Sequence, residues 1–251
     1  MNHFFVQPDA VFPDENGTGG TAYLTGGDVN HIQNVLRMKA GEELLLSNGE
    51  GEDFHCVIDA FEEDRIVLRI LDRQASLTEP SLKVTLFQAL PKADKMELII
   101  QKAVELGVFA ICPVETQRSV VKYDAKKQAS KRERWQKIAE SAAKQSRRGI
   151  IPEVLPVCRL NEALKQAKEL DRILIPYENY KDIKATKELL SQIRPDERVG
   201  IIIGPEGGFA EEEVEAAINA GAEPISLGRR ILRTETAPLM LLSVLLFQME
   251  A

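Results

Sequence analysis

From residue 82 onward, short apolar runs alternate with longer segments of helical periodicity. Strands are expected at 82–90, 109–114, 172–176, 198–203 and 224–227. Helices are expected at 95–106, 130–146, 160–168, 182–193, 211–220 and 238–249. Strands that alternate with helices of this length predict an α/β fold, with a mostly parallel sheet covered by helices on both faces.

The first 73 residues have a different pattern. Apolar or alternating runs at 4–6, 43–47, 53–61 and 65–71 predict a small β-rich unit. One helix is expected within it, from Asp28 as its N-cap to Arg37. Residues 74–80 have no strong periodicity, so we place the domain boundary there, between residues 1–73 and 74–251.

Two loops near the C-terminus, at 204–209 and 227–237, each follow an apolar run and open a helix. Open α/β sheets present such loops to small ligands. A phosphate cradle needs backbone donors and a cation, whereas Pro205 has no N–H and Glu206 is negative. The loops therefore predict two walls of one pocket for a flat ligand that is neutral or cationic. The alternative is a pair of ordinary strand-to-helix turns.

The charge of the chain is unevenly distributed. Its formal net charge of −7 disfavours a nucleic-acid partner when the chain is taken whole. Residues 1–75 hold 14 acidic and 5 basic residues, a net charge of −9, which leaves +2 for the remainder. Residues 118–148 hold 11 basic and 3 acidic residues, a net charge of +8. This segment fits a polyanion such as RNA; the alternative is a solvated basic helix face.

Other features exclude several classes of protein. The start of the chain has no signal-peptide pattern, and the longest apolar stretch, 239–247, is far shorter than a membrane span, so we expect a cytoplasmic protein. Cys56, Cys112 and Cys158 are isolated, which predicts reduced thiols and no metal site. The last helix is apolar on all sides, and we predict that a second subunit covers one side of it in a homodimer.

Four motifs occur in series along the chain: HIQNVLR at 31–37 followed by Gly41, KAVELG at 102–107, GPEGG at 204–208 and ILRTETA at 231–237. With this set the chain closely resembles the ribosomal small-subunit methyltransferase E family over nearly its full length. The resemblance implies a SPOUT-type domain with a trefoil knot, preceded by a PUA-like β-barrel that helps to hold RNA. It also implies a homodimer that uses S-adenosylmethionine to methylate N3 of a uridine in 16S ribosomal RNA of the small ribosomal subunit.

The resemblance further implies where the cofactor binds. In the family it lies among three loops, which correspond here to 176–178, 204–208 and 227–234. S-adenosylmethionine has no phosphate and carries a positive sulfonium, in agreement with the pocket predicted from Glu206 and the glycines beside it. The implied cofactor residues are Pro176, Tyr177, Glu178, Gly204, Pro205, Glu206, Gly207, Gly208, Leu227, Gly228, Ile231, Leu232 and Thr234.

Methylation at N3 of uridine requires removal of the N3 proton or stabilisation of the resulting anion. Arg233 lies in the motif loop beside the expected methyl donor and is the predicted catalytic residue. Glu235 is a weaker candidate, as base or orienting group. The alternative is that Arg233 and Glu235 pair with each other and only shape the loop.

The predicted RNA contacts are basic or polar residues of both domains: His31, Arg37, Arg118, Lys122, Lys144, Gln145, Arg147 and Arg148. His31 has the alternative of an ordinary helix-face histidine. Three positions depart from the family's pattern, because Lys144 replaces an acidic residue, Arg147 a glycine and His3 an arginine. Two further functions stay open: a catalytically silent RNA-binding or ribosome-assembly factor of the same fold, and a methyltransferase that acts on a small molecule or a protein.

Overall fold

The computed structural model describes residues 1–15 and 19–249, and the chain forms two compact units. Unit 1 comprises Met1–Glu79 and Ala143–Ile151, and unit 2 comprises Pro80–Ala142 and Pro152–Ala251. Both units therefore draw on residues that are far apart in the sequence.

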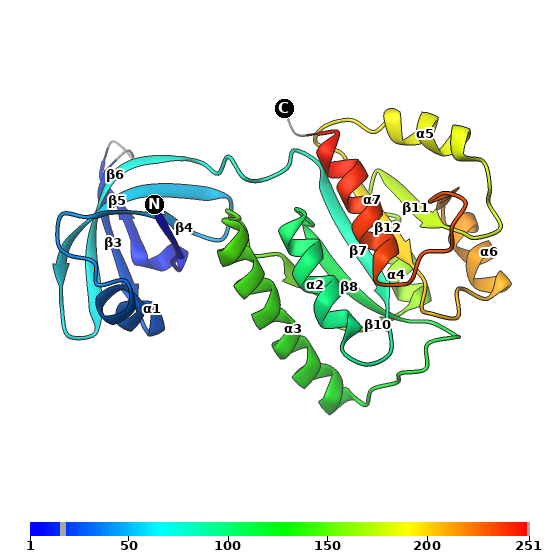
Figure 1. Cartoon of the computed structure of the whole chain (residues 1–251), viewed down its shortest axis with the longest axis horizontal. Coiled ribbons are helices and arrows are strands. Elements are labelled where there is room, and N and C mark those ends of the chain that lie inside the picture. Colours follow the sequence, from blue (N-terminus) through cyan, green and yellow to red (C-terminus); the bar gives the residue numbers. More distant parts are fainter. Residues whose placement is uncertain (16–18, 250–251) are drawn as a thin grey trace. The chain divides into compact units, whose positions relative to one another are not determined.

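Unit 1 is built on a six-stranded sheet (Figure 1). Its strands are β1 (Asn2–Phe5), β2 (Val11–Pro13), β3 (Gly20–Thr25), β4 (Glu43–Ser47), β5 (Glu52–Phe61) and β6 (Arg65–Ala75), with a short 3-10 helix at Pro8–Ala10. The order is β1-β4-β5-β6-β3-β2, and every pairing is antiparallel except that of β1 with β4. Alternate residues such as Leu44, Leu46, Ile66 and Leu68 are fully buried in one apolar core. The predicted β-rich unit is therefore correct, although β2 and β3 were not predicted.

The helix predicted at 28–37 is present at 27–35, but it is not a uniform α-helix and it ends two residues earlier than predicted. An α-helical turn at Gly27–Asn30 (α1) continues as a π-helix at His31–Val35, where the Leu36 N–H donates to the His31 carbonyl. The chain then leaves the helix through Arg37, whose φ of 54° is left-handed. Asp28 lies in the first turn and is not the N-cap, because Gly26 occupies that position with a φ of 70°.

The boundary predicted between residues 73 and 74 lies inside β6. Gln74 and Ala75 still pair with β5, and the Ser76 N–H donates to the Gly51 carbonyl at 2.8 Å. The segment Ala143–Ile151 joins the same unit, since the Gly51 N–H donates to the Gly149 carbonyl at 3.2 Å. Local periodicity identifies neither feature, because both depend on pairing with residues elsewhere in the chain.

Unit 2 contains a seven-stranded sheet in which every pairing is parallel. Its strands are β7 (Lys83–Ala89), β8 (Ala110–Glu115), β9 (Glu153–Val154), β10 (Cys158–Arg159), β11 (Arg172–Pro176), β12 (Arg198–Ile203) and β13 (Glu223–Ile225). The order is β10-β8-β7-β12-β11-β13, and β9 pairs with β8. The α/β fold class with a parallel sheet is thus confirmed.

Helices cover both faces of this sheet (Figure 1). They are α2 (Lys95–Glu105), α3 (Ala125–Ser146), α4 (Leu160–Ala167), α5 (Ile183–Ser191), α6 (Glu211–Asn219) and α7 (Thr236–Phe247). Helix α7 packs on α2 and β12, while α4 packs on α6, β8 and β10. Helix α3 begins five residues earlier than predicted, because Asp124 accepts the Lys127 N–H at 2.8 Å and so caps the first turn. None of the helices in the described residues is long and apolar enough to cross a membrane.

This topology determines where a ligand can bind in unit 2. Strands β12, β11 and β13 are neighbours, and parallel pairing brings their carboxyl ends to one edge of the sheet. The loops that leave them begin at Gly204, Tyr177 and Ser226. Crevices at this edge are the usual ligand sites of open α/β sheets.

Candidate functional site

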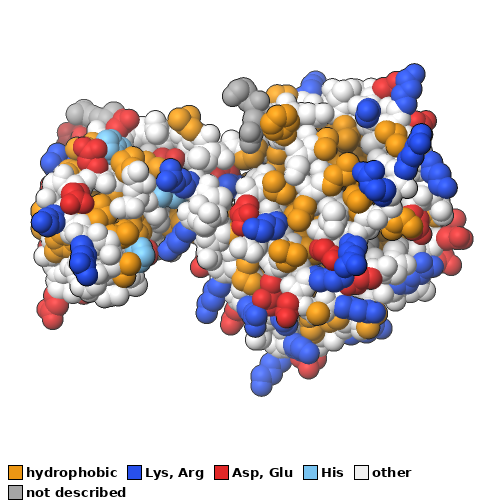
Figure 2. Space-filling model, in the orientation of Figure 1, with side chains coloured by type: hydrophobic (Ala, Val, Ile, Leu, Met, Phe, Trp, Pro, Cys, Tyr) orange, Lys and Arg blue, Asp and Glu red, His pale blue; other side chains and the backbone are white. Residues whose placement is uncertain are grey.

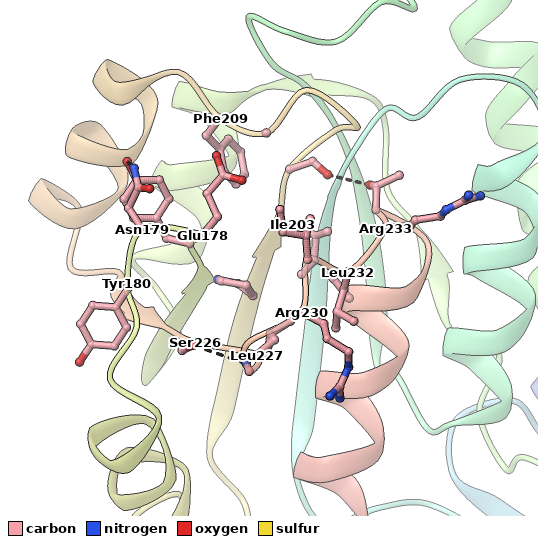
Figure 3. A pocket seen from close by; sticks show the side chains of 18 of the residues that line it. Glu178, Asn179, Tyr180, Ile203, Phe209, Ser226, Leu227, Arg230, Leu232 and Arg233 are labelled. Atoms are coloured by element: carbon pink, nitrogen blue, oxygen red, sulfur yellow. Dashed lines mark hydrogen bonds between the residues drawn. The ribbon is translucent and has the colours of Figure 1, made fainter.

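A pocket of about 1100 Å³ lies among these three loops in unit 2 (Figure 3). Its volume is slightly above the roughly 300–1,000 Å³ typical of small-molecule sites. Ile203, Leu227 and Leu232 supply apolar wall, and Glu178 points toward Phe209 on one side. All the predicted cofactor residues line the pocket except Gly207; the other lining residues are Lys95, Asn179, Tyr180, Lys181, Ile183, Ile203, Phe209, Ser226, Arg229, Arg230, Arg233 and Ala237.

Glycine is needed at particular points of the pocket wall. A Cβ at Gly204 would lie 3.1 Å from the Phe209 ring, so a side chain there would displace it. Gly208 and Gly228 have φ values of 67° and 110°, which other residues rarely adopt. These positions keep the backbone accessible to a ligand, as the sequence predicts for the loop at 204–208.

Glu206 is part of an ion pair that the sequence analysis did not identify. Lys95, at the start of α2, places its Nζ 3.0 Å from Glu206 Oε1 and 3.1 Å from Glu235 Oε2. The hydrogen bond to Glu206, followed by that to Glu235, raises the pKa of Lys95, so it is protonated at neutral pH. Burial disfavours the charged form of Glu206, but hydrogen bonds from its own backbone, Lys95 and the Lys92 N–H outweigh burial and lower its pKa. The Glu206 charge is therefore largely compensated by Lys95, and Glu178 is another carboxylate on the pocket wall.

A buried hydrogen-bond chain joins two of the pocket loops. Gln88 Nε2 donates to Thr234 Oγ1 at 3.0 Å, and Thr234 Oγ1 donates to the Gly204 carbonyl at 2.7 Å. Gln88 is fully buried and Thr234 is 6 % exposed. The two loops predicted to form one pocket are thus held together from the interior of the sheet.

The predicted catalytic pair lies at the edge of the pocket. Arg233 Nη1 is 3.9 Å from Glu235 Oε1, and the Arg233 side chain is 82 % exposed while that of Glu235 is only 16 % exposed. Figure 3 shows Arg233 extending away from the centre of the pocket. The two predicted residues are therefore neighbours, but the contact is long and most of the Arg233 side chain is exposed to solvent. Glu235 is absent from the described lining of the pocket, which favours the role of orienting group over that of base.

Arg118 lies against the glycine loop. Its Nη1 donates to the Gly207 carbonyl at 3.0 Å, and the Gln117 N–H donates to Glu213 Oε1 at 2.7 Å. Arg118 and Lys122 are both exposed. Two of the predicted RNA contacts are thus on the segment that borders the pocket loop. Gly207 itself lies next to Arg118.

The remaining predicted RNA contacts lie in unit 1. His31, Arg37, Gln145 and Arg147 are exposed, and Arg147 has a left-handed φ of 58°, a conformation that favours glycine. Lys144 is also exposed, although its Nζ lies 3.3 Å from Asp28 Oδ2.

The prediction for Arg148 is wrong. This residue is 3 % exposed, and its Nη2 lies 2.7 Å from Glu79 Oε2 in unit 1. Burial in an ion pair removes the guanidinium from reach of a phosphate. Net segment charge could not reveal this pairing, because Glu79 is distant in sequence.

The basic segment is partly neutralised by acidic partners. Along α3, Arg134 pairs with Glu97 at 2.8 Å and Arg132 with Glu153 at 3.0 Å. Figure 2 accordingly shows Lys and Arg side chains interspersed with Asp and Glu on the larger body. The net charge of +8 therefore overstates the positive surface available to RNA.

No group of three or more His, Cys, Asp and Glu side chains within 1–15 and 19–249 is arranged to hold a metal ion.

Lys95 and Gln88 are polar site residues that the sequence analysis did not predict. Lys95 is the first residue of the helix that follows the strand at Lys83–Ala89. Side chains at this position face the ligand-binding edge of a parallel sheet, so the position of Lys95 in the sequence could have identified it. Gln88 is a polar residue inside an otherwise apolar buried strand. Such a residue indicates a specific buried partner.

Comparisons with known proteins agree with this architecture. A family model described as RNA methyltransferase domain matches residues 78–246, and one described as RNA methyltransferase PUA domain matches residues 24–71. The chain is 38 % identical over 233 residues to the ribosomal RNA small subunit methyltransferase E of Bacillus subtilis, covering 92 % of this chain and 91 % of that protein. It is 32 % identical over 225 residues to the protein of the same name from Mycobacterium bovis, covering 88 % of this chain and 84 % of the relative.

A solved structure has the same fold over its full length. The ribosomal RNA small subunit methyltransferase E from Neisseria gonorrhoeae, crystallised with S-adenosyl methionine, superposes with a TM-score of 0.79 at 35 % identity. The superposition covers 99 % of this chain and 98 % of that one. The sequence matches and this shared fold show that the chain belongs to the ribosomal RNA small subunit methyltransferase E family.

Proposed function

We propose that this protein binds S-adenosylmethionine in the pocket of unit 2 and methylates N3 of a uridine in 16S ribosomal RNA. The observation that carries the proposal is the three-loop pocket, in which Arg233 stands at the edge of an apolar, glycine-lined cleft. Its action on ribosomal RNA places it in the cytoplasm. The trefoil knot implied by the resemblance stays a prediction.

The lining residues fit S-adenosylmethionine. Apolar wall from Leu227, Ile231 and Leu232 suits the adenine ring, and the backbone beside Gly204 and Gly228 suits its polar edge. Lys95 is occupied by Glu206 and Glu235, so it does not provide the unpaired cation that a phosphate ligand would need. Bound there, S-adenosylmethionine supplies an electrophilic methyl group on a sulfonium sulfur.

In the proposed reaction the chain's own residues make N3 of uridine nucleophilic. Arg233 approaches O2 or O4 and stabilises the negative charge that develops when N3 loses its proton to water. No covalent bond between the chain and the RNA would be needed. Glu235 Oε1 lies 3.9 Å from Arg233 Nη1, a long contact that keeps the guanidinium near the pocket edge without a tight ion pair.

The exposed predicted contacts supply the RNA surface. Arg118 and Lys122 lie on the segment that borders the pocket loop, and the PUA-like unit 1 contributes His31, Arg37, Lys144, Gln145 and Arg147. Arg and Lys contacts to phosphates set the register of the RNA, and the pocket then selects the base. Arg148 has no part in this surface.

We further propose that the enzyme is a homodimer through α7. The helix buries Leu241, Leu242, Leu245 and Leu246 within unit 2. Its other side carries Met240 at 40 % exposure and Phe247 at 78 % exposure. Large exposed apolar side chains on one helix face favour a protein partner.

Nucleoside mass spectrometry of 16S ribosomal RNA tests the proposed function. RNA from a strain that lacks this gene should have no 3-methyluridine, and the wild-type gene should restore it. Arg233→Ala should fail to restore the modification while its protein still binds S-adenosylmethionine. An unchanged 3-methyluridine content in the deletion strain would contradict the proposal, and would favour an RNA-binding or assembly factor of the same fold.

A further inference from the structure

Lys95 is the residue that connects the pocket loops to the catalytic edge. Its Nζ lies between a carboxylate of the loop after β12 and the carboxylate that precedes α7, at 3.0 Å from Glu206 and 3.1 Å from Glu235. Glu235 in turn has its other oxygen 3.9 Å from Arg233. The four side chains therefore form a row of alternating charge that runs from the pocket wall to the exposed guanidinium.

We propose that Lys95 is a positioning residue for methyl transfer, which acts by occupying Glu235 so that Arg233 stays available to the uridine. The inference rests on the proposed function of Arg233. It assigns the role to Lys95 as a protonated cation, because two carboxylates stabilise its charged form and exclude it as a general base.

The physical basis of this role is that Lys95 and Arg233 compete for the carboxylate of Glu235. Glu235 is 16 % exposed, so its charge is poorly solvated and favours a close cation. Lys95 supplies that cation at 3.1 Å, while Arg233 remains at 3.9 Å with 82 % of its side chain exposed. Without Lys95, Arg233 is the neighbouring cation within reach, and guanidinium–carboxylate pairs readily become bidentate. Arg233 would then be held on Glu235 and withdrawn from the substrate.

Glu206 has a second hydrogen-bond donor besides Lys95. Its carboxylate accepts both Lys95 Nζ and the Lys92 N–H, at 3.0 and 3.1 Å. Loss of Lys95 leaves the second bond in place, so the loop at 204–208 keeps one anchor to the segment before α2. The effect of the substitution should therefore appear at Arg233 more than in cofactor affinity.

The first test measures the environment of Arg233 without reference to activity. Phenylglyoxal, which modifies accessible arginines, should modify Arg233 several times more slowly in Lys95→Gln than in the wild type. The rate should recover in the double variant Lys95→Gln/Glu235→Gln, because the competing carboxylate is gone. Arg229, an exposed arginine of the same loop, provides the internal reference. Equal Arg233 rates in the wild type and Lys95→Gln would overturn the inference.

The second test measures catalysis. In Lys95→Gln, kcat should fall by about 10- to 100-fold, the scale of a misplaced catalytic group, with a smaller change in Kd for S-adenosylmethionine. The same substitution should cost much less in the Glu235→Gln background. Lys102→Gln is the matched control, because Lys102 lies on the same helix and pairs with Glu105 at 2.9 Å; it should keep wild-type kcat.

The outcomes separate the inference from the proposed function. A wild-type protein that leaves 16S ribosomal RNA unmethylated would refute the proposed function, and the phenylglyoxal rates would still decide the role of Lys95. An equal loss of kcat for Lys95→Gln in both backgrounds would instead show that Lys95 acts independently of Glu235, and would refute the inference alone.

Discussion

The buried pair of Arg148 and Glu79 gives a sharp prediction about what stabilises unit 1. Glu79 accepts Arg148 Nε at 2.9 Å, Arg148 Nη2 at 2.7 Å, the Gly149 N–H at 2.7 Å and the Ile150 N–H at 3.1 Å. The side chains are 4 % and 18 % exposed for Arg148 and Glu79 respectively. Glu79→Ala removes the acceptor for all of these donors while the guanidinium stays buried.

Breaking one partner of a buried ion pair costs about 3–5 kcal/mol. Domains are stable by only about 5–15 kcal/mol, so unit 1 of this variant should be close to its limit of stability. With a slope of about 1–3 kcal/mol/M, the urea midpoint of unit 1 should fall by at least about 1 M. Glu79→Gln, which keeps an acceptor oxygen, should cause a smaller decrease.

The assay must follow the two units separately. Hydrogen exchange of peptides from β4 and β5 reports on unit 1, whereas the fluorescence of Trp135, the single tryptophan of the chain, reports on unit 2. Glu62→Ala is the control, because its partner Arg65 lies on the surface of the same unit; it should leave the midpoint unchanged. If Glu79→Ala strengthened RNA binding and left exchange in β4 and β5 unchanged, Arg148 would be a phosphate contact and our account of it would be wrong.

Three further predictions concern other parts of the chain. Burial lowers the pKa of His3 below its usual value of 6.5, so on acidification the unfolded chain binds a proton at this residue before the folded chain does. The stability of the fold should therefore decrease as the pH drops below about 6.5. His3→Gln should lack this decrease in urea midpoints measured over a pH series. The Cys112 and Cys158 thiols form a hydrogen bond at 3.4 Å, and this bond raises the pKa of Cys112 and lowers that of Cys158. Iodoacetamide should therefore alkylate Cys158 first in the native protein, and faster labelling of Cys112 by mass spectrometry would contradict this. Phe247→Glu should disrupt the proposed homodimer and give the mass of a monomer in light scattering at micromolar concentration, whereas the mass of a dimer would exclude this face of α7 as the interface.

Much of the fold could be predicted from the sequence, because apolar periodicity reports burial directly. Each strand predicted between residues 82 and 227 is present in the sheet of unit 2. The short strands β9 and β10 have only two residues each, too few to show a period. The π-helix at His31–Val35 was also missed, since its apolar spacing differs little from that of an α-helix over one turn.

The pocket could be predicted because two of its three loops, at 204–209 and 227–237, have an unusual composition. Their joint location follows from parallel pairing of β11, β12 and β13. The partners of charged residues could not be predicted in the same way. Lys95 with Glu206, and Arg148 with Glu79, join residues that are 111 and 69 positions apart. Such pairs depend on tertiary structure, so local charge density misrepresents which cations are available.

Transfer of a labelled methyl group from S-adenosylmethionine to 16S ribosomal RNA by the purified protein is the decisive test of the proposed function. RNA would be offered both free and in assembled small subunits, and the product identified by nucleoside mass spectrometry. We expect label in 3-methyluridine with the wild type, and loss of that label with Arg233→Ala at unchanged cofactor affinity. Label at another atom or in another nucleoside, or full activity of Arg233→Ala, would contradict the proposed function.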